Sequence, residues 1–319
     1  MKILFVPREP IWPEVTGEQV ERLRAAGAET VIVTQDRDEM LREIRDADIL
    51  LGTIDEELLE HAGRLQWVQS LSSGVDAMLF PAFVDSDIVL TSEKGLVGDH
   101  LADHAFGLLL SLTRSIAWAA RQRRWANRIA MRRAGRELSN ATAGIIGFGG
   151  TGTAVARRAR AFGMRVLAVD PDVTERPDYV EALSPPERLH EMAGSSDVLF
   201  VCCPLTAATF HLIDGAVLDA MPDRSYVINV TRGPIVDQTV LMAALDSGKL
   251  AGAGLDVTEQ EPLPDDSPLW GYDNVVITPH TAGASQYRVG RLQQRVINNI
   301  GHLAAGQPLE GVIDKRKGY

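Results

Sequence analysis

The sequence predicts an α/β fold with two open parallel sheets, each covered by helices. Short apolar runs alternate with helical patterns over about the first hundred residues, and the same alternation restarts at Ala143. Between the two series, a long apolar helical pattern leads into an arginine-rich stretch. Since 319 residues exceed one usual hydrophobic core, we expect two domains.

Each element of the first series follows from its local pattern. Strands are expected where apolar residues run together, and helices where apolar residues recur at helical spacing. Asp99 is the expected N-cap of the long apolar helix. The expected strands are 2–6, 30–33, 48–52, 65–70 and 87–92, and the expected helices are 17–27, 39–47 and 98–114.

The second series follows the same logic and forms the second sheet. After its last strand, a helical pattern over 286–306 begins a C-terminal segment that can return to pack on the first domain. The expected strands of this series are 143–149, 164–170, 196–203, 225–230, 250–257 and 274–280.

Composition narrows the class of protein. The net charge of −11 argues against nucleic acid as the main partner, and the absence of a run of about 18 apolar residues predicts no membrane span. Cys202 and Cys203 are adjacent, which suits neither a disulfide framework nor a zinc site, so we expect a reducing cytoplasm. The eight arginines between 114 and 136 indicate a solvated arm or a subunit contact, with phosphate or nucleic-acid binding as the alternative.

A glycine-rich turn gives the strongest local signal. Gly147, Gly149 and Gly152 follow an apolar strand and open an amphipathic helix, as in dinucleotide-binding turns. Gly147 is expected to make the tight turn, Gly149 to let the backbone approach a pyrophosphate, and Gly152 to let helix and strand pack closely. The amides around Gly150 and Thr151 are then placed to hold the phosphates at the helix N-terminus.

Acidic residues at the end of the next strand indicate which dinucleotide is bound. Asp170 ends that strand, where a carboxylate accepts hydrogen bonds from ribose hydroxyls, and Asp172 adds a second negative charge against a 2′-phosphate. We therefore expect NAD as the cofactor. A glycine-rich turn without a ligand is the alternative.

A possible metal motif competes with this interpretation. In "HLADH", His100 and His104 lie four residues apart on one helical face with Asp103 between them, close to the pattern of some zinc peptidases. Such a site needs a glutamate and a third ligand, and the helix is otherwise apolar, as a buried helix is. We expect structural roles for both histidines and no bound metal.

Three polar residues follow successive strands of the second sheet. Arg232 follows "YVINV", Glu261 comes after the strand that ends near Asp256, and His280 follows "NVVITP". Open α/β folds place their ligands at the carboxyl ends of such strands. Each residue alone fits a surface or capping role, but an arginine, a carboxylate and a histidine beside a nicotinamide form a set able to reduce a 2-keto acid.

Four motifs resemble one enzyme family in their order and spacing. The segments "GIIGFGGTG", "NVTRGPIVD", "LAGAGLDVTEQEPLP" and "NVVITPHTAG" are similar to signatures of the D-isomer-specific 2-hydroxyacid dehydrogenases, which include phosphoglycerate dehydrogenases and glyoxylate or hydroxypyruvate reductases. The resemblance covers nearly the whole chain, because "SLSSGVDAM" resembles the family's substrate-carboxylate loop and "LADHAFGLLLSLTR" its interdomain helix.

The resemblance implies a role for individual residues. Arg232 is the substrate-binding arginine, His280 the acid/base and Glu261 its carboxylate partner, while amides near Ser73 and Gly74 hold the substrate carboxylate. The positions that the resemblance assigns to NAD contacts, together with the glycine turn, are Gly147, Gly149, Gly150, Thr151, Gly152, Asp170, Val230, Thr231 and Asp256.

The resemblance also implies an architecture and a reaction. It implies a Rossmann NAD-binding domain, residues 99–284, and a flavodoxin-like catalytic domain built from residues 1–98 and 285–319. The implied activity is NAD-dependent hydride transfer between a small D-2-hydroxy acid and its 2-keto acid, in a homodimer formed through the arm after the interdomain helix. An NAD-sensing, corepressor-like binding protein of the same fold is the alternative. Asp103, where the family usually has glutamate, and Gly150, where a larger residue is commoner, depart from the pattern.

Overall fold

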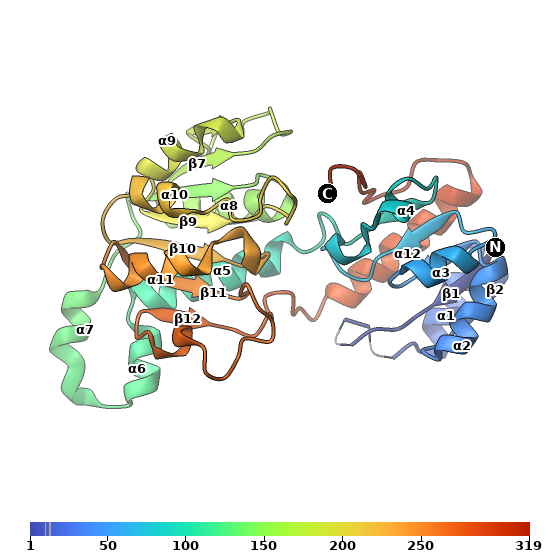
Figure 1. Ribbon diagram of the computed structural model, residues 1–319, viewed down its shortest axis with the longest axis horizontal. Coiled ribbons are helices and arrows are strands. Elements are labelled where there is room, and N and C mark those ends of the chain that lie inside the picture. Colours follow the sequence, from blue (N-terminus) through green and yellow to red (C-terminus); the bar gives the residue numbers. More distant parts are fainter. Residues whose placement is uncertain (10, 13) are drawn as a thin grey trace. The chain divides into compact units, whose positions relative to one another are not determined.

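The computed structural model describes residues 1–9, 11–12 and 14–319, and the chain divides into two compact units (Figure 1). Unit 1 consists of Met1–Val97 with Ser285–Tyr319, and unit 2 consists of Gly98–Ala284. Gly98 belongs to unit 2, one residue before the expected boundary, because it begins the first helix of that unit.

Unit 1 is built on a five-stranded parallel sheet within the described residues. Its strand order, β2-β1-β3-β4-β5, is that of flavodoxin-like folds. The strands are β1 (Lys2–Phe5), β2 (Thr30–Val33), β3 (Ile49–Leu51), β4 (Trp67–Gln69) and β5 (Val89–Thr91). The helices are α1 (Gly17–Ala25), α2 (Arg37–Glu43), η1 (Ile44–Asp46), α3 (Glu56–His61), η2 (Asp76–Met78), α4 (Pro81–Val84) and α12 (Arg288–Ala304).

Local sequence explains where these helices begin and which side they bury. Thr16 caps α1 in a reciprocal capping box with Gln19, and an aspartate caps α2 and α3. In α12, Leu292, Val296 and Ile300 recur every four residues and are fully buried against the sheet core. The C-terminal part of the chain thereby completes the core of unit 1.

Unit 2 is built on a seven-stranded parallel sheet within the described residues. Its order, β12-β11-β10-β9-β6-β7-β8, is the Rossmann order extended by one strand. The strands are β6 (Thr142–Ile146), β7 (Arg165–Val169), β8 (Ala182–Ser184), β9 (Val198–Val201), β10 (Ser225–Asn229), β11 (Leu250–Leu255) and β12 (Val275–Ile277). The helices are α5 (Gly98–Thr113), α6 (Ile116–Gln122), η3 (Trp125–Asn127), α7 (Arg128–Ala134), α8 (Gly150–Ala161), η4 (Pro186–Arg188), α9 (Leu189–Gly194), α10 (Gly215–Ala220), η5 (Gly233–Ile235), α11 (Gln238–Asp246) and η6 (Pro268–Gly271).

The two sheets confirm the expected α/β class with open parallel sheets. In unit 2 the strand order reverses between β6 and β9, and the crevice at such a point is where open α/β sheets bind ligands. Helix α5 packs against this sheet: a Cβ on Gly254 of β11 would lie 2.8 Å from Cβ of Leu108, so only glycine permits this approach.

Three features of unit 2 differ from or refine the expectations. Asp99 is not an N-cap, because α5 already begins at Gly98; Asp99 lies in the first turn, where Arg158 of α8 lies 3.4 Å from it. Asp103 accepts a hydrogen bond of 2.7 Å from the same arginine. The arginine-rich arm consists of α6, η3 and α7, which extend away from the sheet (Figure 1).

Candidate active site

The glycine turn joins β6 to α8 in unit 2. Gly147 has a φ of +87°, and a Cβ there would lie 2.8 Å from the backbone of Cys203, in the loop after β9. A Cβ on Gly152 would lie 2.0 Å from the Gly147 carbonyl oxygen. By contrast, a Cβ on Gly149 would meet nothing within 4 Å. Two glycines therefore serve close packing, and the third borders open space.

The start of α8 can hold an anion in that space. Its first intrahelical bond runs from the Thr153 amide to the Gly149 carbonyl, at 2.9 Å. The amides of Gly150, Thr151 and Gly152 precede that bond, so they point out of the helix N-terminus together with the positive end of the helix dipole. The donors and the open space beside Gly149 fit the diphosphate of a dinucleotide.

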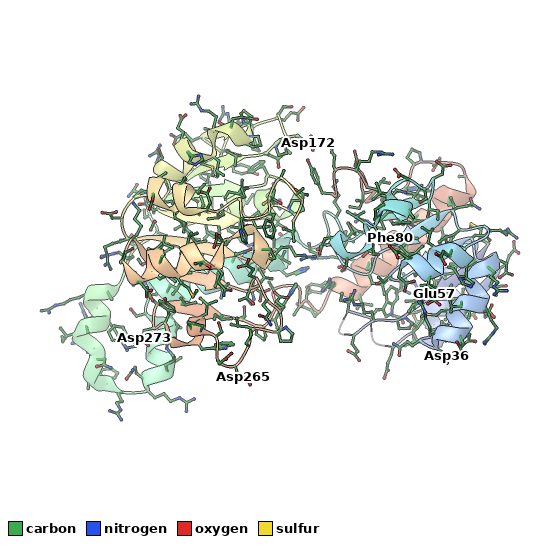
Figure 2. All side chains as sticks on the ribbon, viewed as in Figure 1. Asp36, Glu57, Phe80, Asp172, Asp265 and Asp273 are labelled. Atoms are coloured by element: carbon green, nitrogen blue, oxygen red, sulfur yellow. The ribbon has the colours of Figure 1, made fainter. Side chains whose placement is uncertain are left out.

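Asp170 follows β7 and lies beside the same turn. Its Oδ2 accepts from the Phe148 amide at 2.6 Å, and its Oδ1 accepts from the Asp172 and Val173 amides at 2.9 and 2.8 Å. A carboxylate offers about four lone-pair positions, so these three bonds leave capacity for a ribose hydroxyl. Asp172 is exposed at the surface of unit 2 (Figure 2).

The loop after β10 carries Arg232. Thr231 donates its amide and its hydroxyl to the Asn229 side chain, and that side chain donates to the Arg232 carbonyl at 2.8 Å, which fixes the turn. Val230, which stands between Asn229 and Thr231 in the chain, is buried. A Cβ on Gly233 would lie 1.8 Å from the Thr258 carbonyl, so the loop after β10 packs directly on the loop after β11.

Glu261 and His280 form a hydrogen-bonded pair. Nδ1 of His280 lies 2.7 Å from Oε2 of Glu261, and the Thr258 amide donates to Oε1 of Glu261 at 3.1 Å. The Glu261 hydrogen bond raises the pKa of His280 against the opposing effects of burial and of the Arg232 charge. Burial by itself raises the pKa of Glu261. The His280 hydrogen bond and the Arg232 charge help to outweigh that effect, so the pKa of Glu261 lies below its ordinary value. Arg232 thus acts on both partners, and the structure brings the three residues together.

Asp256 holds the segment that carries His280. Its carboxylate is buried and accepts from the Thr278 hydroxyl at 2.6 Å and from the Thr281 and Ala282 amides at 2.9 Å each. Although burial raises the pKa of Asp256, these bonds and His104 hold it below its ordinary value. These bonds can therefore hold the backbone of His280 at a φ of +52°, a conformation that residues with a Cβ seldom adopt.

Two histidines outside the predicted set support these loops. Nε2 of His104, on α5, lies 2.7 Å from the Thr278 hydroxyl and 3.3 Å from the Asp256 carboxylate. Nε2 of His211 lies 2.7 Å from Glu259, two residues before Glu261. The "HLADH" motif drew attention to His104, but nothing in the sequence pairs His211 with Glu259. Among the described residues, no group of three or more histidine, cysteine or acidic side chains is arranged to hold a metal ion.

Ser73 and Gly74 lie in unit 1, in the loop after β4. Ser70 Oγ donates to the Ser72 carbonyl at 3.0 Å, and Ser72 Oγ donates to the Gly74 carbonyl at 2.7 Å. The two serine hydroxyls therefore bind carbonyl groups of their own loop and help to fix its conformation. Ser73 and Gly74 are both half-buried.

Comparisons with known proteins agree with the fold and identify the family. The family described as "D-isomer specific 2-hydroxyacid dehydrogenase, NAD binding domain" matches residues 106–282. A glyoxylate reductase from Thermofilum pendens is 35% identical over an alignment of 292 residues that covers 88% of this chain and 85% of that protein.

Solved structures give the same result. A D-isomer specific 2-hydroxyacid dehydrogenase from Xanthobacter autotrophicus, in complex with NADPH and MES, has a TM-score of 0.83 and 27% identity, with 99% of both chains covered. An NADPH-dependent glyoxylate/hydroxypyruvate reductase from Sinorhizobium meliloti, in complex with NADP and sulfate, has a TM-score of 0.82 and 28% identity, with 100% of both chains covered.

A Rossmann sheet with a dinucleotide turn and a histidine–carboxylate–arginine set defines a nicotinamide-dependent oxidoreductase. The chain belongs to the D-isomer-specific 2-hydroxyacid dehydrogenase family. It is an enzyme that acts on CH-OH groups with a nicotinamide cofactor, and the comparisons give the corepressor-like alternative no support. In the described part of the chain, no helix is both long and apolar enough to cross a membrane.

Proposed function

We propose that the enzyme reduces small 2-keto acids of the glyoxylate and hydroxypyruvate type to D-2-hydroxy acids, with NADH as the preferred cofactor. The observation that carries this proposal is the Glu261–His280 pair at 2.7 Å, with the Arg232 charge acting on both residues. In a carbonyl reduction, a protonated histidine can donate the proton and a guanidinium can stabilise the negative charge that develops on the oxygen.

His280 is the general acid of this proposal. Its Nδ1 is held by Glu261, so Nε2 is the nitrogen that donates a proton to the substrate carbonyl oxygen. Because Glu261 raises the pKa of His280, the ring stays protonated at a higher pH than an ordinary histidine. In the oxidation direction, the neutral ring accepts the proton from the hydroxyl group.

Arg232 stabilises the negative charge that develops on the carbonyl oxygen. When bound, the nicotinamide supplies the hydride to the carbonyl carbon. The guanidinium offers planar paired donors, and Arg232 already donates one bond to the Thr231 carbonyl at 2.8 Å, which restricts its orientation. The amides of Ser73 and Gly74 hold the substrate carboxylate in this proposal.

The cofactor preference rests on Asp170 and Asp172. Gly147, Gly149 and the start of α8 form the turn that holds the diphosphate, while Val230, Thr231 and Asp256 complete the proposed cofactor contacts. A 2′-phosphate beside two carboxylates is repelled, whereas a ribose hydroxyl donates to Asp170. The Sinorhizobium meliloti reductase is described as NADPH-dependent, so this chain is proposed to differ from it.

The experiment is a panel of 2-keto acids assayed with NADH and with NADPH. Glyoxylate and hydroxypyruvate are expected to give the highest kcat/KM, and NADH is expected to be the better donor with either substrate. Failure to reduce any 2-keto acid with either cofactor would contradict the proposed substrate class. Equal efficiency with NADPH would contradict the proposed cofactor preference alone.

The proposal also includes a cytoplasmic homodimer without nucleic-acid or membrane partners. The arm of α6, η3 and α7 has no buried residue, and Ile116, Trp125 and Ile129 are more than half exposed, as expected of a surface that a second subunit covers. Cys202 and Cys203 are free and buried, which suits a reducing compartment. Light scattering of native protein and Trp125→Glu tests the dimer: the native protein should have twice the mass of the variant.

A further inference from the structure

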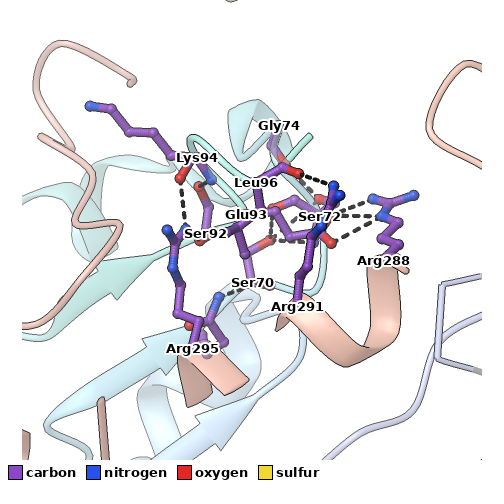
Figure 3. Close-up of polar contacts among 11 residues, drawn as sticks. Ser70, Ser72, Gly74, Ser92, Glu93, Lys94, Leu96, Arg288, Arg291 and Arg295 are labelled. Atoms are coloured by element: carbon purple, nitrogen blue, oxygen red, sulfur yellow. Dashed lines mark hydrogen bonds and ion pairs between the residues drawn. The ribbon is translucent and has the colours of Figure 1, made fainter. Parts of the chain in front are cut away.

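Three arginines of α12 converge on one loop of unit 1, and a second loop lies beside it (Figure 3). Arg288, Arg291 and Arg295 are spaced by three and four residues, which places them on one face of the helix. The loop they contact is 92–96, which follows β5, and that loop is bonded in turn to loop 70–74, which follows β4. The second loop carries Ser73 and Gly74.

Arg288 pairs with a glutamate that is fully buried. Nε of Arg288 donates to both carboxylate oxygens of Glu93 at 3.0 Å, and Nη2 donates to Oε2 as well. The Glu93 side chain is 0% exposed and that of Arg288 is 16% exposed. Burial raises the pKa of Glu93 above its ordinary value even with Arg288 beside it.

A buried ion pair of this kind adds little to stability by itself. Removing two charges from water offsets most of their attraction, and apolar residues of similar volume often serve a core equally well. In some proteins such pairs instead fix one arrangement of the surrounding chain. The question is therefore which arrangement Arg288 and Glu93 fix.

The other two arginines hold the same loop by its carbonyl groups. Nη1 of Arg291 donates to the Leu96 carbonyl at 3.3 Å. Nη1 of Arg295 donates to the Ser92 carbonyl at 3.0 Å and to the Lys94 carbonyl at 2.6 Å. Loop 92–96 is thus tied to α12 along its whole length.

Loop 92–96 in turn holds the loop of Ser73 and Gly74. The Glu93 amide donates to the Ser72 carbonyl at 3.4 Å, and the Ser72 hydroxyl donates to the Gly74 carbonyl at 2.7 Å. The Ser72 amide donates to Ser70 Oγ at 3.1 Å. A displacement of Glu93 therefore moves the backbone on which the Ser73 and Gly74 amides lie.

We propose that Glu93 and Arg288 are positioning residues that orient the Ser73 and Gly74 amides toward the carboxylate of the substrate. This inference rests on the proposed function, which assigns substrate-carboxylate binding to that loop. Glu93 and Arg288 do not touch the reacting atoms in this account. They act through the Glu93–Ser72 backbone bond, so they govern substrate binding and leave proton transfer to His280.

The test compares Glu93→Gln with native protein in steady-state reduction of glyoxylate by NADH. The amide cannot accept the full set of Arg288 bonds, so we expect KM for glyoxylate to rise at least about tenfold, with kcat within about threefold of native. The inhibition constant of oxamate, a 2-keto acid analogue, should rise by the same factor. The dissociation constant of NADH should not change.

A double variant separates positioning from folding. Glu93→Gln with Arg288→Met leaves no unpaired buried charge, so the melting temperature should recover toward the native value while KM stays high. A native KM in the double variant would show that only the unpaired charge mattered and would overturn the inference. Asp85→Asn is the matched control, because it breaks an exposed pair of unit 1 with Arg316, at 2.9 Å, and should leave KM unchanged.

The outcomes distinguish this inference from the proposed function. Native protein that reduces no 2-keto acid contradicts the proposed function and this inference with it. Native protein that reduces glyoxylate, with an unchanged KM and oxamate inhibition constant in Glu93→Gln, contradicts this inference alone. A raised KM for glyoxylate in both the single and the double variant supports it.

Discussion

Glu261→Gln is expected to move the alkaline limit of 2-keto acid reduction to lower pH. The Glu261 hydrogen bond is the largest cause of the raised pKa of His280, while burial and the Arg232 charge act in the opposite direction. Removing the carboxylate charge leaves those two lowering effects in place. The imidazolium that reduction requires is then lost at a lower pH.

The structure sets the size of the shift. Nδ1 and Oε2 are 2.7 Å apart, and two unit charges centred about 4 Å apart attract by about 4 kcal/mol at an effective dielectric of 20 and by about 1 kcal/mol in water. The two side chains are 48% and 38% exposed, so solvent screening places the pair between these limits. At about 1.4 kcal/mol per pKa unit, we expect a downward shift of about 1 to 2 pH units.

The assay is the pH dependence of glyoxylate reduction at saturating NADH for native protein and Glu261→Gln. Glu181→Gln is the matched control, because it makes the same substitution in an exposed pair of unit 2, with Arg165 at 2.6 Å. Its profile should overlay the native one. An alkaline limb that is unshifted or displaced upward in Glu261→Gln would refute the assignment of Glu261 as the partner that tunes His280.

Four further substitutions test Arg232, Asp170 and two glycines of the glycine turn. Arg232→Lys should lower kcat/KM for glyoxylate by about 10²-fold with little change in NADH affinity, since lysine lacks the paired donors; collapse of NADH affinity with normal substrate kinetics would place Arg232 in the cofactor site. Asp170→Ser should narrow the ratio of kcat/KM for NADH over NADPH by about tenfold or more, because a repulsion of about 4 kcal/mol before screening is removed; an unchanged ratio counts against that role. Gly149→Ala should keep its melting temperature but bind NADH about tenfold more weakly in titrations, because its Cβ enters open space where the diphosphate is proposed to lie. Gly152→Ala should unfold more easily by about 1–3 kcal/mol in denaturant titrations, because its Cβ would lie 2.0 Å from the Gly147 carbonyl; the reverse pattern in the two glycine variants would contradict the turn assignment.

The parts of the site that depend on local signals could be predicted from the sequence. The glycine turn lies between a strand and a helix that adjoin it in the chain, so its spacing alone indicated the β6–α8–β7 unit. Arg232, Glu261 and His280 follow β10, β11 and β12, which are neighbours in one parallel sheet, so their carboxyl ends meet at one edge. Their individual roles remain predictions.

The parts that depend on distant contacts could not be predicted. Glu93 and Arg288 are 195 positions apart in the sequence. They pair only because α12 packs on unit 1 with the helix face that carries Arg288 turned toward Glu93. His211 and Glu259 are 48 positions apart and stand in loops without a pattern. The prediction of Asp99 as an N-cap was wrong because α5 begins at Gly98. A Cβ on Gly98 would lie 2.4 Å from the Gly150 carbonyl, so α5 starts against the glycine turn, which is far from it in the sequence.

Short or partly exposed elements also escaped the sequence patterns. Strand β8, Ala182–Ser184, has three half-buried residues and no apolar run, so periodicity does not reveal it. Asp256 was predicted only as a cofactor contact, and the structure adds that its carboxylate binds the amides of Thr281 and Ala282 beside His280. A lone aspartate after a strand gives no indication in the sequence that it will bind the backbone of a loop that follows another strand.

The most direct test of the central claim is the effect of His280→Ala on glyoxylate reduction, measured together with NADH binding. If His280 is the proton donor, kcat should fall by about 10²- to 10⁴-fold while the dissociation constant of NADH stays within about twofold of native. A variant that binds NADH normally and reduces glyoxylate at close to the native rate would contradict the assignment of His280 as the general acid, and with it the mechanism proposed for this enzyme.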